Sequence, residues 1–207
     1  KFYQNLNCEY IPPWDFNGGA MIEGSDRCNL DCPHCYHIPN NKIQDPTQEL
    51  LMSQVANIES ILRWPQDPTW TVLLAGAEPT LRKDFPYLLE RIKTDYNNTV
   101  RCFVMSNGIK FEDVNFVKSS KSAGLDSVCF GLNHPTYNNN MIIRNKQERA
   151  VYNILEEDLG LTYLSYTMNN FNELNDIMKE ILYKGWSPTH FRIRYGSDIG
   201  RNTGQER

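Results

Sequence analysis

Short apolar runs alternate along the chain with segments whose apolar residues recur every three or four positions. The runs predict β-strands, and the helical period predicts the helices between them. Six strands are expected, at Ala20–Glu23, Thr71–Ala75, Val100–Ser106, Ser127–Leu132, Leu161–Thr167 and His190–Tyr195. Five helices are expected, at Gln48–Arg63, Lys83–Asp95, Phe111–Lys121, Gln147–Leu159 and Asn172–Lys184.

This alternation predicts an α/β fold with parallel strands and outer helices. Six strand–helix units are too few to close an eight-stranded barrel. The pattern therefore leaves an open doubly wound sheet or a partial (β/α)6 TIM-like barrel. Both architectures bind ligands at the carboxyl ends of their strands, so the residues that follow each strand form the candidate site.

The predicted elements fall within residues 20–196, which we expect to form one core domain. Residues 1–19 are rich in aromatic residues, Pro and Gly and are interpreted as an extended lead-in segment. Residues 197–207 are polar and are interpreted as a tail or a truncated end.

Charge and hydropathy exclude some classes of protein. The 207 residues include 21 Lys and Arg and 25 Asp and Glu, for a net charge of −4. This mild acidity argues against nucleic-acid binding through bulk positive charge. No apolar run approaches the roughly 18 residues that a membrane helix needs, so no membrane association is expected.

Three of the six cysteines lie close together, with a C-x3-C-x2-C spacing at Cys28, Cys32 and Cys35. Clustered thiols are typical of a metal or cluster site in a reducing compartment. Three thiolates can hold three corners of a [4Fe–4S] cluster, which usually takes four, so one iron stays open to another ligand.

The alternative is a zinc site completed by His34, His37 or Cys8. The spacing favours the cluster because structural zinc sites more often use two separated ligand pairs, and no second pair follows. Cys102 and Cys129 fall inside predicted strands and are expected to be small buried apolar residues.

The second predicted strand is followed by Gly76, Ala77 and Glu78. Small residues let a ligand approach the backbone closely, and the carboxylate of Glu78 suits an ammonium group. The alternative is an ordinary turn before a helix, with Glu78 solvated.

The third and fourth strands are followed by further polar residues. Ser106 and Asn107 can hydrogen-bond a sugar hydroxyl, although Asn107-Gly108 is also a common turn pair. Asn133 follows the fourth strand. Arg144, further on, can pair with a carboxylate or lie solvated in a loop.

Together these residues resemble the radical S-adenosylmethionine (radical SAM) superfamily. The resemblance lies in CNLDCPHC followed by Tyr36, then GAEPT, then SNG, each after a predicted strand. The usual form of the second motif is Gly-Gly-Glu-Pro, and Ala77 replaces its second Gly. The resemblance implies a partial six-stranded (β/α) barrel.

The resemblance also implies roles for individual residues. Cys28, Cys32 and Cys35 would ligate a [4Fe–4S] cluster, whose open iron is chelated by S-adenosylmethionine (SAM). The remaining assignments place Glu78 on the methionine ammonium beside Gly76 and Ala77, Tyr36 on the adenine, Ser106, Asn107 and Asn133 near the ribose and methionine, and Arg144 on the carboxylate.

The activity implied by the resemblance is reductive cleavage of SAM to a 5′-deoxyadenosyl radical, which abstracts hydrogen from a substrate. A one-electron donor such as flavodoxin or ferredoxin is implied, and the oxygen sensitivity of the cluster implies a cytoplasmic setting. The lateral opening of a partial barrel favours a peptide or protein substrate. The alternatives are a small activase, an enzyme of cofactor or modified-base biosynthesis, and a non-enzymatic zinc- or cluster-binding module.

Overall fold

The computed structural model describes residues 19–32, 35, 37, 40–62, 70–133, 141–168, 172–186 and 190–195. Six parallel strands form one sheet, in the order β1-β2-β3-β4-β5-β6. Their bounds are β1 Gly19–Ser25, β2 Trp70–Gly76, β3 Val100–Ser106, β4 Leu125–Asn133, β5 Gly160–Met168 and β6 His190–Tyr195. All six predicted strands are confirmed.

Within the described residues, five α-helices and two short 3₁₀ helices connect the strands. They are α1 Gln48–Leu62, η2 Pro79–Leu81, α2 Phe85–Asp95, η3 Ile109–Glu112, α3 Val114–Ser122, α4 Met141–Glu156 and α5 Glu173–Lys184. The prediction for α4 started too late, because the exposed residues Met141 and Ile142 do not continue the buried stripe that marks the helix. The prediction for α3 started too early, because Asp113 caps a helix that begins only after η3.

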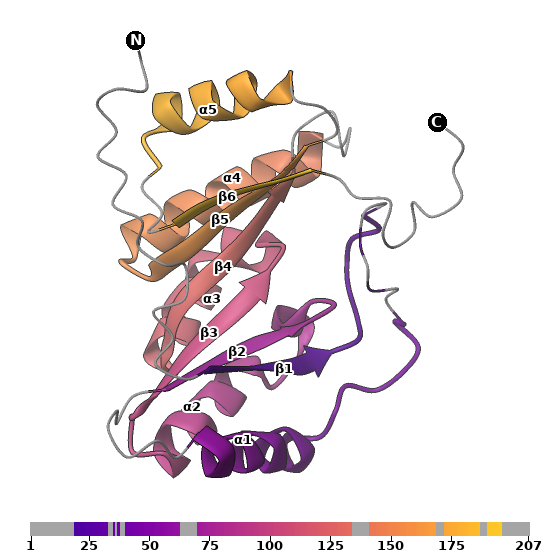
Figure 1. Ribbon diagram of the computed structural model, residues 1–207, viewed down its shortest axis with the longest axis vertical. Coiled ribbons are helices and arrows are strands. Elements are labelled where there is room, and N and C mark those ends of the chain that lie inside the picture. Colours follow the sequence, from indigo (N-terminus) through magenta and orange to yellow (C-terminus); the bar gives the residue numbers. More distant parts are fainter. Residues whose placement is uncertain are drawn as a thin grey trace.

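The consecutive strand order decides between the two candidate architectures. A doubly wound sheet reverses its strand order and places helices on both faces. Here every strand pairs with its neighbour in the chain, and right-handed crossovers then place every connecting helix on the same face. Figure 1 shows the helices along the outside of a curved sheet, which is a partial (β/α)6 barrel.

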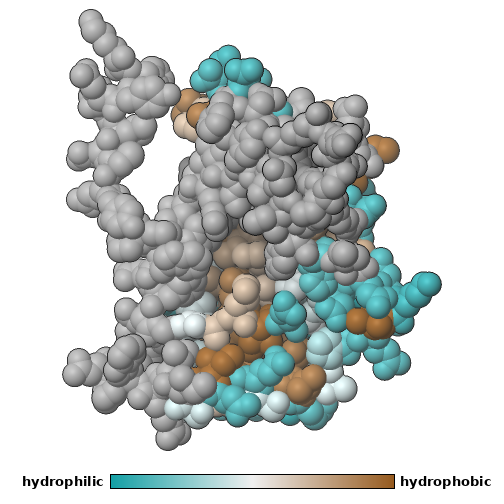
Figure 2. All heavy atoms as spheres, turned by 45° about the vertical axis from the view of Figure 1, so that its right-hand side comes forward, coloured by the Kyte–Doolittle hydropathy of each residue, from teal (hydrophilic) through white to brown (hydrophobic). Residues whose placement is uncertain are grey.

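The hydrophobic core lies between the helices and the outer face of the sheet. Alternate strand residues such as Val72, Val104 and Leu164 are fully buried there against the apolar stripes of the helices. The opposite, concave face carries Met21, Glu23 and Met105, which are exposed. Figure 2 shows apolar atoms in a recess on the side that lies to the right in Figure 1.

The predicted domain limits remain predictions. Gly19 is already part of β1, while residues 1–18 and 196–207 lie outside the described residues. Within the described parts, no helix is both long and apolar enough to cross a membrane.

Candidate functional site

The segments that follow β1, β2 and β3 meet at the carboxyl end of the sheet. They carry Cys28, Glu78 and Asn107. The backbone N–H of Asn107 donates to Glu78 Oε2 at 2.7 Å, and its side-chain amide reaches Cys28 Sγ at 3.7 Å. Parallel strands bring their carboxyl ends to one edge, so residues far apart in the chain form one site.

The loop after β1 presents three half-buried thiols, at Cys28, Cys32 and Cys35. A turn brings the Cys35 N–H within 3.1 Å of the Cys32 carbonyl oxygen. Among the described residues, no three His, Cys, Asp or Glu side chains are grouped to hold a single metal ion. A cluster binds each thiolate through a different iron, so three thiols on one loop fit this cofactor.

Cys28 is the thiol whose surroundings are best defined. Its sulfur accepts hydrogen bonds from the Leu30 N–H at 3.3 Å and from the Asn107 amide. Its own N–H donates to Asn41 Oδ1 at 3.0 Å. Burial raises the pKa of the Cys28 thiol, and the negative charge of Glu78 acts in the same direction.

Further residues were predicted to contribute to the site around this loop. His37, a zinc ligand in the alternative interpretation, lies 3.4 Å from a carboxylate oxygen of Asp26. Tyr36, His34 and Cys8 lie outside the described residues, and the adenine contact of Tyr36 stays a prediction.

Glu78 is a buried carboxylate held by neutral donors, with a side chain only 1% exposed. Its Oε1 accepts from Thr80 Oγ1 at 2.5 Å and from Ser106 Oγ at 2.9 Å. The backbone of Asn107 donates to Oε2. These bonds fix both carboxylate oxygens just beyond the carboxyl end of β2.

The charge of Glu78 is incompletely compensated. Burial raises the pKa of Glu78 above its ordinary value, although the hydrogen bonds from Thr80, Asn107 and Ser106 act in the opposite direction. No Lys, Arg or His among the described residues forms an ion pair with it. A buried carboxylate of this kind suits a positively charged or N–H-rich ligand.

The backbone requires a glycine at position 76, two residues before Glu78. Gly76 has φ +116°, and a Cβ there would meet the Ser25 carbonyl oxygen at 2.4 Å. That same oxygen accepts from the Ala77 N–H at 2.8 Å. β1 therefore passes directly over this turn, which accounts for Gly76 without a ligand.

Ser106 and Asn107 are both engaged within the protein. Ser106 Oγ donates to Glu78 and accepts from the Gly108 N–H at 2.9 Å. The carbonyl oxygen of Asn107 accepts from Nε2 of Gln147, a buried residue of α4. Sequence reasoning missed Gln147, because an isolated glutamine inside a helical pattern carries no signal.

Asn133 and Arg144 complete the set predicted for SAM. Asn133 is the last residue of β4 and pairs in register with Thr167, but its side chain lies outside the described part. Arg144 lies on α4, not in the expected loop, and is buried.

Arg144 has ion-pair partners of its own. Glu180 accepts from its guanidinium, as does Glu148 at 3.2 Å. Burial by itself would raise the pKa of Glu180, but the charges and hydrogen bonds of Arg144 and Lys184 together outweigh it, and the pKa lies below its ordinary value. The pair with Glu180 joins α4 to α5. The predicted contact between Arg144 and the SAM carboxylate stays a prediction, and these ion pairs argue against it.

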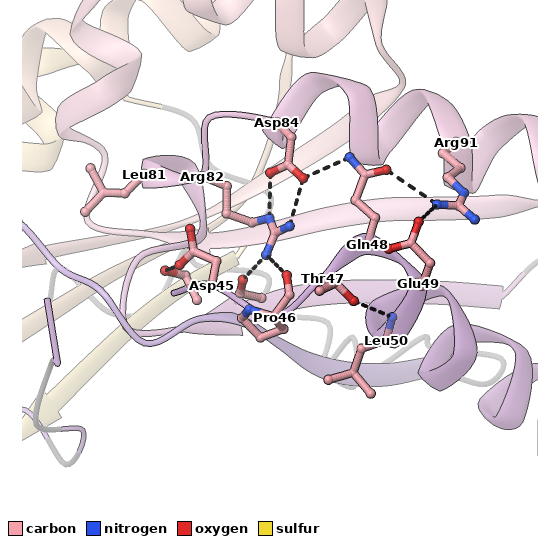
Figure 3. Close-up of polar contacts among 12 residues, drawn as sticks. Asp45, Pro46, Thr47, Gln48, Glu49, Leu50, Leu81, Arg82, Asp84 and Arg91 are labelled. Atoms are coloured by element: carbon pink, nitrogen blue, oxygen red, sulfur yellow. Dashed lines mark hydrogen bonds and ion pairs between the residues drawn. The ribbon is translucent and has the colours of Figure 1, made fainter. Parts of the chain in front are cut away.

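A second buried arginine, Arg82, anchors the glutamate segment to the cluster loop (Figure 3). Its guanidinium donates to the carbonyl oxygens of Gly24 at 2.9 Å and Pro46 at 2.8 Å, on the two sides of that loop. It also forms a two-point pair with Asp84, at 3.0 and 2.9 Å. Arg82 thus fixes both ends of the loop beside Glu78.

A smaller ion pair closes the base of the same loop. Arg27 pairs with Asp45, which also accepts from Ser25 Oγ at 2.7 Å. Arg27 further donates to the Leu81 carbonyl oxygen at 3.1 Å. The cysteine loop is therefore held from two directions by residues that carry no motif of their own.

Replacing Arg82 by alanine is expected to lower the free energy of unfolding by about 2–4 kcal/mol, because two carbonyl oxygens and Asp84 lose their partner. Arg91 is the matched control in Figure 3: its side chain is 32% exposed, against 3% for Arg82, and its partner Glu49 is 77% exposed. Arg91→Ala is expected to cost about 0–1 kcal/mol. Urea unfolding measures both, and equal losses would contradict this role.

Cys102 and Cys129 are buried in β3 and β4, as predicted. Burial raises the pKa of each thiol to about 12. Neither thiol is therefore a good metal ligand or nucleophile in this fold.

Fold and site together define a class of protein: a partial (β/α)6 barrel with a cysteine cluster loop at the carboxyl end of its strands. A sequence profile of the Radical SAM superfamily matches residues 22–182. The chain therefore belongs to the Radical SAM superfamily, whose enzymes use a [4Fe–4S] cluster and SAM.

Two relatives illustrate the sequence similarity. The chain is 33% identical over 111 residues to the 7,8-dihydro-6-hydroxymethylpterin dimethyltransferase of Methanocaldococcus jannaschii, covering 53% of this chain and 21% of that protein. It is 27% identical over 174 residues to a probable GTP 3′,8-cyclase of Methanococcus aeolicus, covering 77% of this chain and 55% of that protein. The chain thus spans about a fifth to a half of these relatives.

Solved structures support the fold. Streptococcus suis SuiB bound to the precursor peptide SuiA has a TM-score of 0.64 at 12% identity, covering 88% of this chain and 40% of that chain. Methylornithine synthase (PylB) has a TM-score of 0.62 at 14% identity, covering 91% and 57%. At this level of identity the likeness concerns the fold alone.

Proposed function

We propose that this chain is the core of an enzyme that cleaves SAM reductively and acts on a small heterocycle that contains an aminopyrimidinone ring. The SAM-cleaving activity is supported by one observation: Asn107 contacts both Cys28 of the cysteine loop and the buried carboxylate of Glu78. When bound, the cluster supplies the electron that breaks the sulfonium C–S bond of SAM and so provides a carbon radical for hydrogen abstraction.

The contribution of the protein is to bind and orient these groups. Cys28, Cys32 and Cys35 would hold the cluster at the open end of the barrel. Glu78 would accept hydrogen bonds from the SAM amino group, since its oxygens are fixed and it lacks an ion-pair partner among the described residues. Ser106 would support it from β3.

The substrate class is suggested by the names of the two relatives. One name contains GTP and the other a pterin. Guanine and pterin share an aminopyrimidinone ring, which presents two neighbouring N–H donors. A carboxylate accepts such a pair of donors well.

The described part of the concave face presents the carboxylate of Glu23 among apolar side chains. Glu23 pairs in register with Ala75, and Leu74 pairs with Val104. Met105, the residue after Val104, therefore lies at the same level of the sheet as Glu23. Met21 and Met105 are exposed on this face. No ion pair joins Glu23 to another residue of the described ranges. We propose that Glu23 binds the ring edge while the methionines contact its faces.

The test measures 5′-deoxyadenosine formed by reconstituted, reduced protein under anaerobic conditions. GTP or a dihydropterin is expected to increase its formation over SAM alone, and Glu23→Gln is expected to reduce this increase. Glu90→Gln, on the exposed surface of α2, is the matched control and is expected to behave like the wild type.

Stimulation by a peptide, and by neither heterocycle, would contradict the substrate class and favour the peptide substrate predicted from the sequence. No 5′-deoxyadenosine from protein that holds the cluster would contradict the whole proposal. We further propose a small electron-transfer protein such as flavodoxin or ferredoxin as the donor, and a reducing compartment such as the cytoplasm, because exposed clusters of this type are oxygen-sensitive.

A further inference from the structure

We propose that Asn107 is a positioning residue that donates a hydrogen bond to a cluster ligand and thereby raises the reduction potential of the cluster. The inference rests on the proposed function, because it assumes that Cys28 ligates the cluster. The evidence for it is the set of hydrogen bonds that the backbone and the side chain of Asn107 form.

All four polar groups of Asn107 are engaged. Its N–H donates to Glu78 Oε2 at 2.7 Å, and its carbonyl oxygen accepts from Gln147 Nε2 at 2.9 Å. Its side-chain Oδ1 accepts from the Ile109 N–H at 3.1 Å. Its Nδ2 donates to Asn29 Oδ1 at 2.8 Å and lies 3.7 Å from Cys28 Sγ.

These contacts settle which end of the side-chain amide faces the sulfur. Because Oδ1 must accept from the Ile109 N–H, a flipped amide would set two N–H donors against each other. The flip would also set the Oδ1 of Asn107 against that of Asn29. Nδ2 therefore points at Cys28, and the residue cannot rotate away without losing two hydrogen bonds.

The backbone of Asn107 is fixed as firmly as its side chain. Gln147, which is buried, spans from α4 to the carbonyl oxygens of Asn107 and Gly131, at 2.9 and 3.2 Å. Gly108 follows with φ +82°, and a Cβ there would lie 2.0 Å from the Phe130 ring. Asn107 thus sits on a turn held by β4 and α4.

A hydrogen bond to a ligating sulfur acts on the cluster electrostatically. Reduction adds negative charge, and a donor at the sulfur stabilises the more negative state, so it raises the potential. Charge-assisted bonds of this kind are stronger than neutral ones. The same residue donates to Glu78, so a single side chain and its own N–H join the cluster to the proposed amino-group site.

The sharpest variant is Asn107→Asp. It keeps an oxygen for the Ile109 N–H and leaves both backbone contacts intact, but it removes the donor and places a carboxylate near Cys28 Sγ. Asn107→Ala removes the donor without adding charge. Ser106→Ala is the matched control, because it loses a bond to Glu78 and does not contact Cys28.

The measurement is iron content followed by an anaerobic redox titration of the cluster, monitored by EPR. We expect both Asn107 variants to lower the midpoint potential, Asn107→Asp by more, at unchanged iron content. Ser106→Ala is expected to keep the wild-type potential while SAM binding weakens.

Wild-type potential in both Asn107 variants, at full iron content, would overturn the inference and leave the proposed function standing. If Asn107→Asp fails to hold iron, the potential of Asn107→Ala decides the question. Wild-type protein that takes up no iron would overturn the proposed function and the inference with it.

Discussion

Replacing Cys32 by alanine is expected to abolish the iron–sulfur cluster. Three thiols on one loop are the complete protein ligand set of this site as proposed, so the loss of one leaves two irons without a protein ligand. Anaerobic reconstitution followed by iron and sulfide analysis measures the effect, and the visible absorption of the cluster should disappear with the iron. Full iron retention in Cys32→Ala would contradict the ligand assignment.

Cys102→Ser is the matched control for this experiment. Cys102 is fully buried in β3, and burial raises the pKa of its thiol to about 12. A hydroxyl in that apolar position is expected to lower the free energy of unfolding by about 1–3 kcal/mol and to leave the iron content unchanged. Loss of iron in this variant would show that the ligands have been misplaced.

Replacing Glu78 by glutamine is expected to weaken SAM binding by about thirtyfold or more while the cluster remains. Removing one partner of a buried, hydrogen-bonded charged contact costs about 2–5 kcal/mol, and each 1.4 kcal/mol is about a factor of ten in affinity. The side-chain amide of the glutamine would also place an N–H donor opposite the N–H of Asn107, which donates to Glu78 Oε2 in the native protein.

Calorimetric titration of reconstituted protein with SAM measures this affinity, and iron analysis of the same sample shows whether the cluster is present. Glu90→Gln again serves as the control, since Glu90 is exposed on α2. Unchanged affinity in Glu78→Gln would remove this residue from the SAM site. Loss of iron would instead indicate that Glu78 supports the cluster loop.

The elements that could be predicted from the sequence are those whose signal lies in neighbouring residues. Val100–Ser106 and His190–Tyr195 were predicted with their observed bounds. The predicted bounds of a helix were less accurate where the helix extends beyond its periodic apolar residues. α4 starts at Met141, and its first turns carry exposed apolar side chains that obscure the period.

The misplacement of Arg144 has a related cause. A single arginine after an asparagine-rich stretch carries no local signal of burial, so it was expected in a loop. In the structure it lies on α4, where Glu148 of the same helix and Glu180 of α5 compensate its charge. Such pairing depends on how two helices pack, which the chain near Arg144 does not encode.

Local patterns in the chain thus predicted the parallel strands, the cysteine loop and the glutamate turn, because periodicity and ligand spacing depend on residues close in sequence. Packing determined the rest. Arg82 reaches Gly24, and Asn107 reaches Cys28, only because parallel strands bring distant loops to one edge of the sheet. The geometry of the site is a property of that edge, where hydrogen bonds join residues that lie 58 and 79 positions apart in the chain.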